Sequence, residues 1–151
     1  MGAGKTTIGR ILSKRLSIPF KDTDEFVEES EGMSIMEIFQ KKGEDYFRTV
    51  EQRIILSTPN EGERVLAVGG GGFNEKTIPF LKKLGPTIFL DLSFEEVKRR
   101  ISIGKKRPHA EDRNLFALFL KRKSFYSRAH YTVWTESLTV DEVVETVLRL
   151  I

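Results

Sequence analysis

The first residues of the chain are of the types that bind phosphate. Gly2-Ala3-Gly4-Lys5-Thr6 matches the second half of the pattern G-x-x-x-x-G-K-[ST]. Glycines let backbone N–H groups approach phosphate oxygens without a Cβ clash, and a helix that follows directs its positive end at the same anion. Lys5 would then reach the outer phosphates, and the Thr6 hydroxyl would bind Mg²⁺. A glycine-rich tail ahead of a helix is the alternative interpretation.

Two further segments that could form a site, a pair of aspartates and a run of glycines, each follow a short apolar segment. Asp22 and Asp24 follow Phe20-Lys21, at the expected end of a strand. The carboxyl ends of strands are where α/β proteins build their sites, although aspartates are also common turn residues. The run Gly69–Gly72 follows an apolar tetrapeptide, and four glycines cost more conformational entropy than a plain turn requires. The carboxylate of Asp24 could orient a hydroxyl group and take its proton.

Three arginines could bind anions. The guanidinium forks of Arg48 and Arg122 suit a planar carboxylate, and Arg107 lies in a polar stretch that could close over a site. Each has a plainer explanation. Arg48 could pair with Glu44 or Glu51 on an exposed helix face, Arg122 stands between two lysines on what could be a solvated basic face, and Arg107 could be a solvated loop charge.

Apolar periodicity predicts the elements that would position these groups. A first helix is expected after the loop 2–7, where apolar residues recur from Ile8 to Leu16. Further helices are expected from about Phe26 to Gly32, from Ser34 to Gly43, over about 44–57, 75–84 and 115–128, from Ser93 and from Thr139, with strands ending at Asp22 and over 65–68, 87–92 and 131–134. Ser34, Ser93 and Thr139 each precede a glutamate by three residues, which is a helix capping box. Alternating short apolar strands and helices predict an α/β fold with a parallel sheet covered on both faces. Trp134 is expected to pack in the core.

Composition excludes several classes of protein. The 151 residues fit one domain, and 25 Lys and Arg against 22 Asp and Glu give a net charge of +3. This bias suits anionic ligands but is no nucleic-acid signature. The chain has no cysteine, which excludes disulfides and thiolate metal sites and agrees with a cytoplasmic location. No apolar run approaches the ~18 residues of a membrane span.

Six features together resemble shikimate kinase along nearly the whole chain. They are the loop 2–6, Asp22-Thr23-Asp24, Tyr46-Phe47-Arg48 with Glu51, Val68-Gly69-Gly70-Gly71, Arg107-Pro108, and Lys121-Arg122 with Tyr126. The resemblance implies a single three-layer P-loop kinase domain over residues 1–151, with a lid near 104–113. It also implies a cytoplasmic monomer that uses ATP and Mg²⁺ to convert shikimate to shikimate 3-phosphate, in aromatic amino acid biosynthesis, without nucleic acid or membrane.

The resemblance also implies roles for individual residues. ATP would be bound by Gly2, Ala3, Gly4, Lys5, Thr6, Thr7, Arg100 and Arg107, and Mg²⁺ by Thr6 and Asp22. Shikimate would be bound by Asp24, Arg48, Gly69, Gly70, Gly71 and Arg122, and catalysis would rest on Lys5, Asp24 and Arg107. Phe39 and Phe47 resemble residues that wall the substrate ring, although core packing is an equally good explanation.

The family's sheet has the strand order 2-3-1-4-5, and its first strand, with the first glycine of the phosphate loop, is missing here. We expect the native chain to begin about ten residues upstream, the length of that strand and half-loop. Without the strand, the backbone groups of its two neighbours would lack partners. Two alternative functions stay open. One is another small-molecule P-loop kinase such as a gluconate kinase, and the other is a truncated, non-catalytic binding module.

Overall fold

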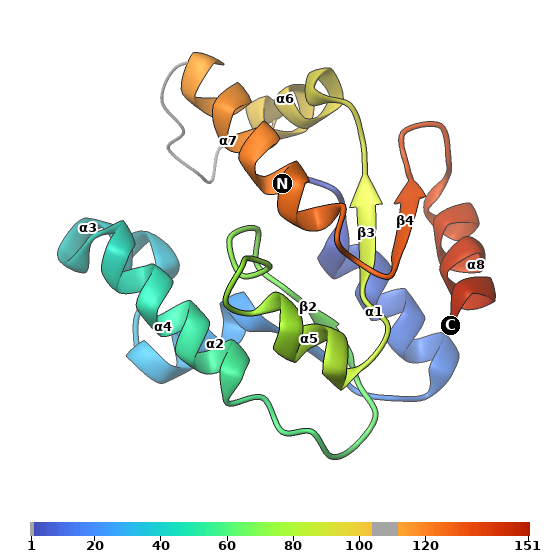
Figure 1. The fold of residues 1–151 in the computed structure, drawn as a ribbon, viewed down its shortest axis with the longest axis horizontal. Coiled ribbons are helices and arrows are strands. Elements are labelled where there is room, and N and C mark those ends of the chain that lie inside the picture. Colours follow the sequence, from blue (N-terminus) through green and yellow to red (C-terminus); the bar gives the residue numbers. More distant parts are fainter. Residues whose placement is uncertain (1, 104–111) are drawn as a thin grey trace.

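The strands lie in two parallel pairs (Figure 1). The computed structural model describes residues 2–103 and 112–151. β1 (Phe20–Asp22) pairs with β2 (Val65–Ala67), and β3 (Ile88–Asp91) pairs with β4 (Tyr131–Trp134). Within the described residues each strand has one hydrogen-bonded neighbour. The parallel α/β arrangement predicted from the sequence is confirmed, and the four strands follow the expected chain order.

Eight helices connect and cover the strands in the described part of the chain. They are α1 (Lys5–Leu16), α2 (Thr23–Glu31), α3 (Ile35–Lys42), α4 (Glu44–Leu56), α5 (Ile78–Leu84), α6 (Phe94–Ile103), α7 (Asp112–Tyr126) and α8 (Val140–Leu150). Capping boxes are present at the starts of α3 and α8. The box predicted at Ser93 is only half formed, because the Glu96 N–H donates to the Ser93 hydroxyl at 3.2 Å but the Ser93 N–H donates to Glu136 instead. None of the described helices has the length and apolar character needed to cross a bilayer.

Two helix starts differ from the sequence prediction. α2 begins at Thr23 rather than near Phe26, because Asp22 caps it by accepting a 3.0 Å hydrogen bond from the Asp24 N–H. α5 begins at Ile78 rather than near residue 75. The residues before it form a turn, in which the Thr77 N–H donates to the carbonyl of Asn74. In both cases a local polar bond sets the boundary.

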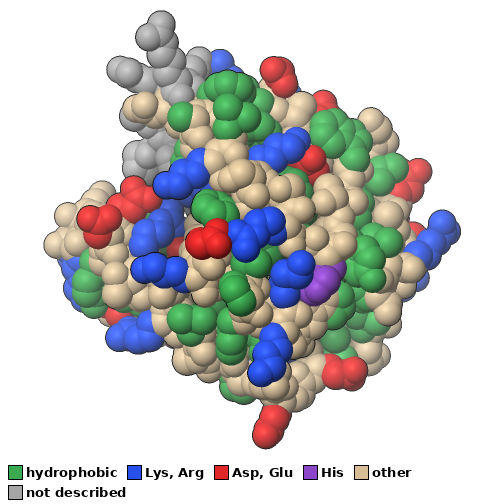
Figure 2. Space-filling view, in the orientation of Figure 1, with side chains coloured by type: hydrophobic (Ala, Val, Ile, Leu, Met, Phe, Trp, Pro, Cys, Tyr) green, Lys and Arg blue, Asp and Glu red, His purple; other side chains and the backbone are tan. Residues whose placement is uncertain are grey.

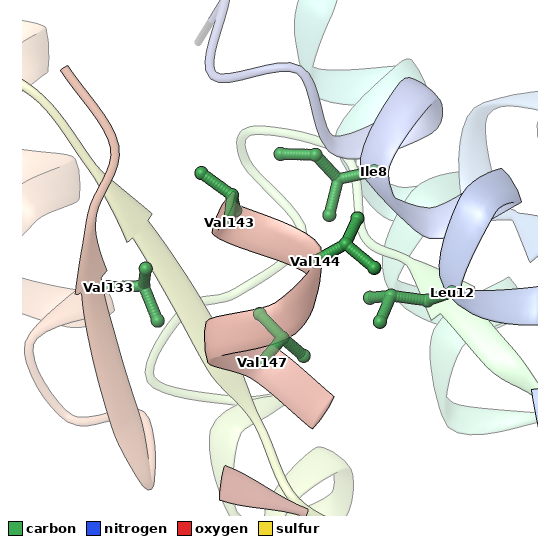
Figure 3. Packing of buried hydrophobic residues seen from close by; sticks show 6 residues of the cluster. All are labelled: Ile8, Leu12, Val133, Val143, Val144 and Val147. Atoms are coloured by element: carbon green, nitrogen blue, oxygen red, sulfur yellow. The ribbon is translucent and has the colours of Figure 1, made fainter. Parts of the chain in front are cut away.

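The largest core cluster joins α1 to α8 and β4 (Figure 3). Its buried members are Ile8, Leu12, Val133, Val143, Val144 and Val147. The helical members recur at spacings of three or four residues, which places them on one face of each helix. The prediction that Trp134 packs in the core is wrong, because its side chain is 47% exposed. β4 lies at the edge of its pair, and three of its four residues face solvent.

A cavity of about 690 Å³ separates the two strand pairs. Its lining includes the strand segments 65–67 and 88–90 and the α1 residues Ile8 and Leu12. The pairs β1-β2 and β3-β4 match positions 2-3 and 4-5 of the order 2-3-1-4-5. The cavity therefore lies at the central position of that order. Among the described residues, β2 and β3 each have one hydrogen-bonded partner.

Candidate active site

The phosphate loop leads directly into α1. Gly4 is the N-cap of the helix, with a left-handed φ of 78°, and Gly2 has a φ of 61°. Side chains are strained in this region, so the two backbone turns require glycine. The first backbone N–H groups of α1 have no acceptor within the helix. The positive end of α1, with Lys5 as its first residue, is therefore suited to binding an anion.

Arg100 lies against the phosphate loop. Its Nη1 donates to the carbonyl of Gly2 at 3.2 Å, and its Nε donates to Glu96 at 2.6 Å. Hydrogen bonds from Arg99 and then Arg100 lower the pKa of Glu96 to about 2. Glu96 therefore stays ionised and holds Arg100 over the loop. The role predicted for Arg100 beside the nucleotide stays a prediction.

Thr6 and Asp22 lie side by side. The Thr6 hydroxyl donates to Asp22 Oδ2 at 3.0 Å, while Asp22 Oδ1 caps α2. Octahedral Mg²⁺ with ligands at 2.0–2.1 Å places adjacent ligand oxygens about 2.9 Å apart, so this pair fits one metal ion. Within residues 2–103 and 112–151, no three acidic, His or Cys side chains form a metal site of their own. Mg²⁺ at such a site keeps phosphate and water ligands, and two protein oxygens are sufficient.

The glycine run after β2 is where acidic and basic side chains converge. A Cβ on Gly69 would lie 2.5 Å from Asp24 Oδ1 and 2.6 Å from Glu51 Oε1. A Cβ on Gly70 would lie 3.1 Å from Nη1 of Arg122. A Cβ on Gly71 would lie 2.1 Å from Nη1 of Arg48. None of these glycines has a positive φ, so close approach of the surrounding side chains explains the glycine requirement.

Hydrogen bonds hold the backbone of this run. The Gly69 N–H donates to the buried Thr23 hydroxyl at 2.8 Å, and the Gly72 N–H donates to the Gly69 carbonyl at 2.9 Å. Tyr126 and Asn74 donate to the carbonyls of Gly70 and Gly71, and Thr77 donates to that of Gly72. Among the described residues, none accepts from the N–H groups of Gly70 or Gly71. The run thus presents two amide donors to a ligand.

Arg48 is held by two carboxylates. Its Nη1 donates to Glu51 at 2.7 Å and its Nη2 to Glu44 at 3.1 Å. Burial would lower the pKa of Arg48, but the charge of Glu51 and the two hydrogen-bonded partners more than offset it, and the pKa is raised. The ion pairs that the sequence suggested, between Arg48 and Glu44 and between Arg48 and Glu51, are therefore present. They orient Arg48 toward Gly71 rather than into solvent.

Glu51 is the most deeply buried acidic group here. Only 2% of its side chain is exposed, and burial raises the pKa of its carboxyl. Arg48 opposes that rise, the charge of Asp24 adds to it, and Arg122 opposes it more weakly. The charges of Asp24, Arg48 and Arg122 all influence the pKa of Glu51, so these three predicted ligands lie in one cluster.

Arg122 does not lie on a solvated basic face. The residue is 7% exposed and its guanidinium faces Gly70. The interpretation of Arg122 as part of a solvated basic face is wrong. α7 directs its side chain inward, although its two neighbours in the sequence are lysines. Phe39 and Phe47 have ring centroids 4.9 Å apart, and Phe47 is a buried member of the cluster that joins α2, α3 and α4. Core packing of Phe47 is therefore confirmed.

No individual role was predicted for Thr23 or Tyr126, both of which anchor the glycine run. Thr23 stands between the two aspartates, and Tyr126 follows Arg122 by one helical turn, so helical spacing was the available signal. Arg107 lies outside the described residues, as does most of the stretch 104–113 predicted to be a lid.

These features define a P-loop kinase. The phosphate loop starts a helix beside the paired Thr6 and Asp22, and a second charged cluster lies at the carboxyl end of β2. Comparison with known proteins names the family. The family model for shikimate kinase matches residues 1–151. The chain belongs to the shikimate kinase family.

Individual relatives agree with this assignment. A shikimate kinase from Aquifex aeolicus is 40% identical, over 99% of this chain and 91% of that protein. One from Sulfurihydrogenibium is 36% identical, over 100% and 93% of the two chains. A solved structure of shikimate kinase from Acinetobacter baumannii in complex with shikimate has a TM-score of 0.91 at 35% identity, covering 99% of this chain and 87% of that one.

Proposed function

We propose that this protein is an active shikimate kinase, which transfers the γ-phosphate of ATP to a hydroxyl of shikimate to give shikimate 3-phosphate. The observation that carries the proposal is the convergence of Asp24, Arg48 and Arg122 on one glycine run. Asp22 connects this cluster to the phosphate loop, because it touches both Thr6 and the Asp24 N–H. In this proposal Asp22 would lie between the two anion sites.

On the acid side, Arg48 and Arg122 would bind the shikimate carboxylate with charge-assisted hydrogen bonds. The free N–H groups of Gly70 and Gly71 would donate to oxygens of the same molecule. Asp24 would accept a hydrogen bond from the attacking hydroxyl, orient it, and take its proton as the new P–O bond forms. Positioning of this kind supplies much of the rate enhancement in phosphoryl transfer.

On the nucleotide side, the N-terminus of α1 and Lys5 would hold the phosphates, with Gly2, Ala3, Gly4 and Thr7 completing the loop. Thr6 and Asp22 would hold Mg²⁺, which supplies positive charge to the phosphoryl oxygens when bound. Arg100 would border the nucleotide, since it is fixed to the loop by the Gly2 carbonyl. Arg107 is proposed to add positive charge at the transferred group.

We also propose that the protein acts as a monomer in the cytoplasm, without nucleic acid. Figure 2 shows basic side chains across the middle of the viewed face, with apolar and acidic side chains between them. This mixed pattern suits small anionic ligands better than a nucleic acid, which favours a continuous basic stripe.

A coupled assay of ADP release tests the proposal with shikimate, with gluconate, and with no acceptor. Shikimate-dependent release is the expected result. Release with gluconate alone would identify another small-molecule kinase. Binding of shikimate without ADP release, measured by calorimetry in the presence of ATP and Mg²⁺, would identify a non-catalytic module.

A further inference from the structure

Tyr126 ends α7 beside the glycine run. Its ring lies 5.1 Å from that of Phe89, on β3, and 6.4 Å from that of Phe73, measured between centroids. These contacts fix the ring between the strand and the loop, so the direction of the hydroxyl is set by packing. The hydroxyl donates to the carbonyl oxygen of Gly70.

That bond determines where the next amide points. The peptide between Gly70 and Gly71 is planar and trans, so its C=O and its N–H point in opposite directions. With the carbonyl held by Tyr126, the Gly71 N–H points away from α7. The Gly71 carbonyl is fixed in turn by Asn74 Nδ2 at 2.9 Å, so the amide has little freedom to rotate.

We propose that Tyr126 is a positioning residue for shikimate binding, which acts by holding the Gly70 carbonyl so that the Gly71 N–H donates to the acid. Tyr126 follows Arg122 by four residues and lies on the same face of α7. One helix therefore sets both an arginine and an amide of the acid site. This inference rests on the proposed function, because it takes the glycine run to be the shikimate site.

The test is Tyr126→Phe, which keeps the ring packing and removes the hydroxyl. We expect the KM for shikimate to rise about 3- to 10-fold, the range for loss of one neutral hydrogen bond. The KM for ATP should stay unchanged, because the phosphate loop lies on another element. In ¹⁵N-glycine spectra without substrate, the amide signal of Gly71 should shift. Tyr131→Phe is the matched control, since Tyr131 lies on β4 and is 38% exposed, and it should change none of these values.

Three results would overturn the inference. The first is an unchanged KM for shikimate, and the second is a fall in kcat with both KM values unchanged. The third is a variant that is unfolded at every temperature, which would assign Tyr126 to the core instead. Gly71→Ala separates this inference from the proposed function. If Gly71→Ala raises the KM and Tyr126→Phe does not, only the inference fails. If neither variant raises it, the glycine run is not the shikimate site.

Discussion

Replacing Gly71 by alanine should weaken the binding of shikimate while leaving the binding of ATP nearly unchanged. The new Cβ would lie 2.1 Å from Arg48 Nη1, whereas ordinary van der Waals contact begins near 3.4 Å. Arg48 is the partner that can move, because the atoms in conflict are at the end of a long side chain. Its guanidinium must shift by about 1.3 Å, the difference between these two separations. A hydrogen bond of about 2.9 Å to a carboxylate does not survive such a shift.

The magnitude follows from the kind of bond that is lost. A hydrogen bond to a charged group contributes about 1.5–3 kcal/mol, which corresponds to a rise of about 10- to 150-fold in the KM for shikimate. The KM for ATP should change little. The fold should persist, because Arg48 is partly exposed and can keep a contact with Glu44.

The coupled ADP-release assay measures this, with shikimate varied at saturating ATP. Gly85→Ala is the control, because a Cβ there meets nothing within 4 Å and the backbone is extended, with a φ of 164°. Gly69→Ala should behave differently again. Its Cβ would collide with the short Asp24 side chain and the buried Glu51, so both kcat and the melting temperature should fall. A normal KM for shikimate in Gly71→Ala would refute the placement of Arg48 at the acid.

Four further outcomes are expected. Asp24→Asn should lower kcat while the KM for ATP stays nearly constant, and a loss confined to the KM for ATP would contradict its role as base. Arg122→Ala should mainly raise the KM for shikimate, and because the residue is buried, calorimetry should also show a lower melting temperature. Thr6→Val should raise the Mg²⁺ concentration for half-maximal activity; an unchanged Mg²⁺ dependence would remove Thr6 from the metal site. Burial raises the pKa of Glu51, so the folded protein binds the proton of this carboxyl more tightly than the unfolded chain does. The stabilisation that results is fully present below the unfolded pKa of about 4.3, and it is lost as pH rises through the pKa of Glu51 in the folded protein. Urea melts across this window should show a smaller decline in Glu51→Gln than in the unsubstituted protein.

Local rules in the sequence predicted most of the elements. Ser34 and Thr139 were expected to start helices, and both make the reciprocal hydrogen bonds of a capping box. The early start of α2 was not predicted, because the decisive bond joins the Asp22 side chain to a backbone N–H two residues later. Its place at the end of a strand allowed Asp22 two roles, as turn residue and as ligand, and the structure shows that it caps a helix while also accepting a hydrogen bond from Thr6.

Convergence of the site could be predicted only by resemblance. Helical spacing places Arg48 and Glu51 on one face of a helix, but it does not say that this face meets Gly71. The same holds for Arg122, whose two lysine neighbours favour an exposed face in the sequence. Burial decided the matter, and burial depends on how α7 packs against the glycine run. Tertiary contacts of this kind carry no local signal in a single sequence.

The geometry between the two anion sites rests mainly on α1. Its N-terminus carries the phosphate loop, and its Thr6 touches Asp22 at the end of β1. Its apolar face packs against α8, which in turn packs against β4 (Figure 3). Because the cavity separates β2 from β3, no backbone ladder among the described residues joins the two strand pairs. α1 also packs directly on β1 and β2, and this contact, together with the Thr6–Asp22 hydrogen bond, keeps Lys5 near Asp24.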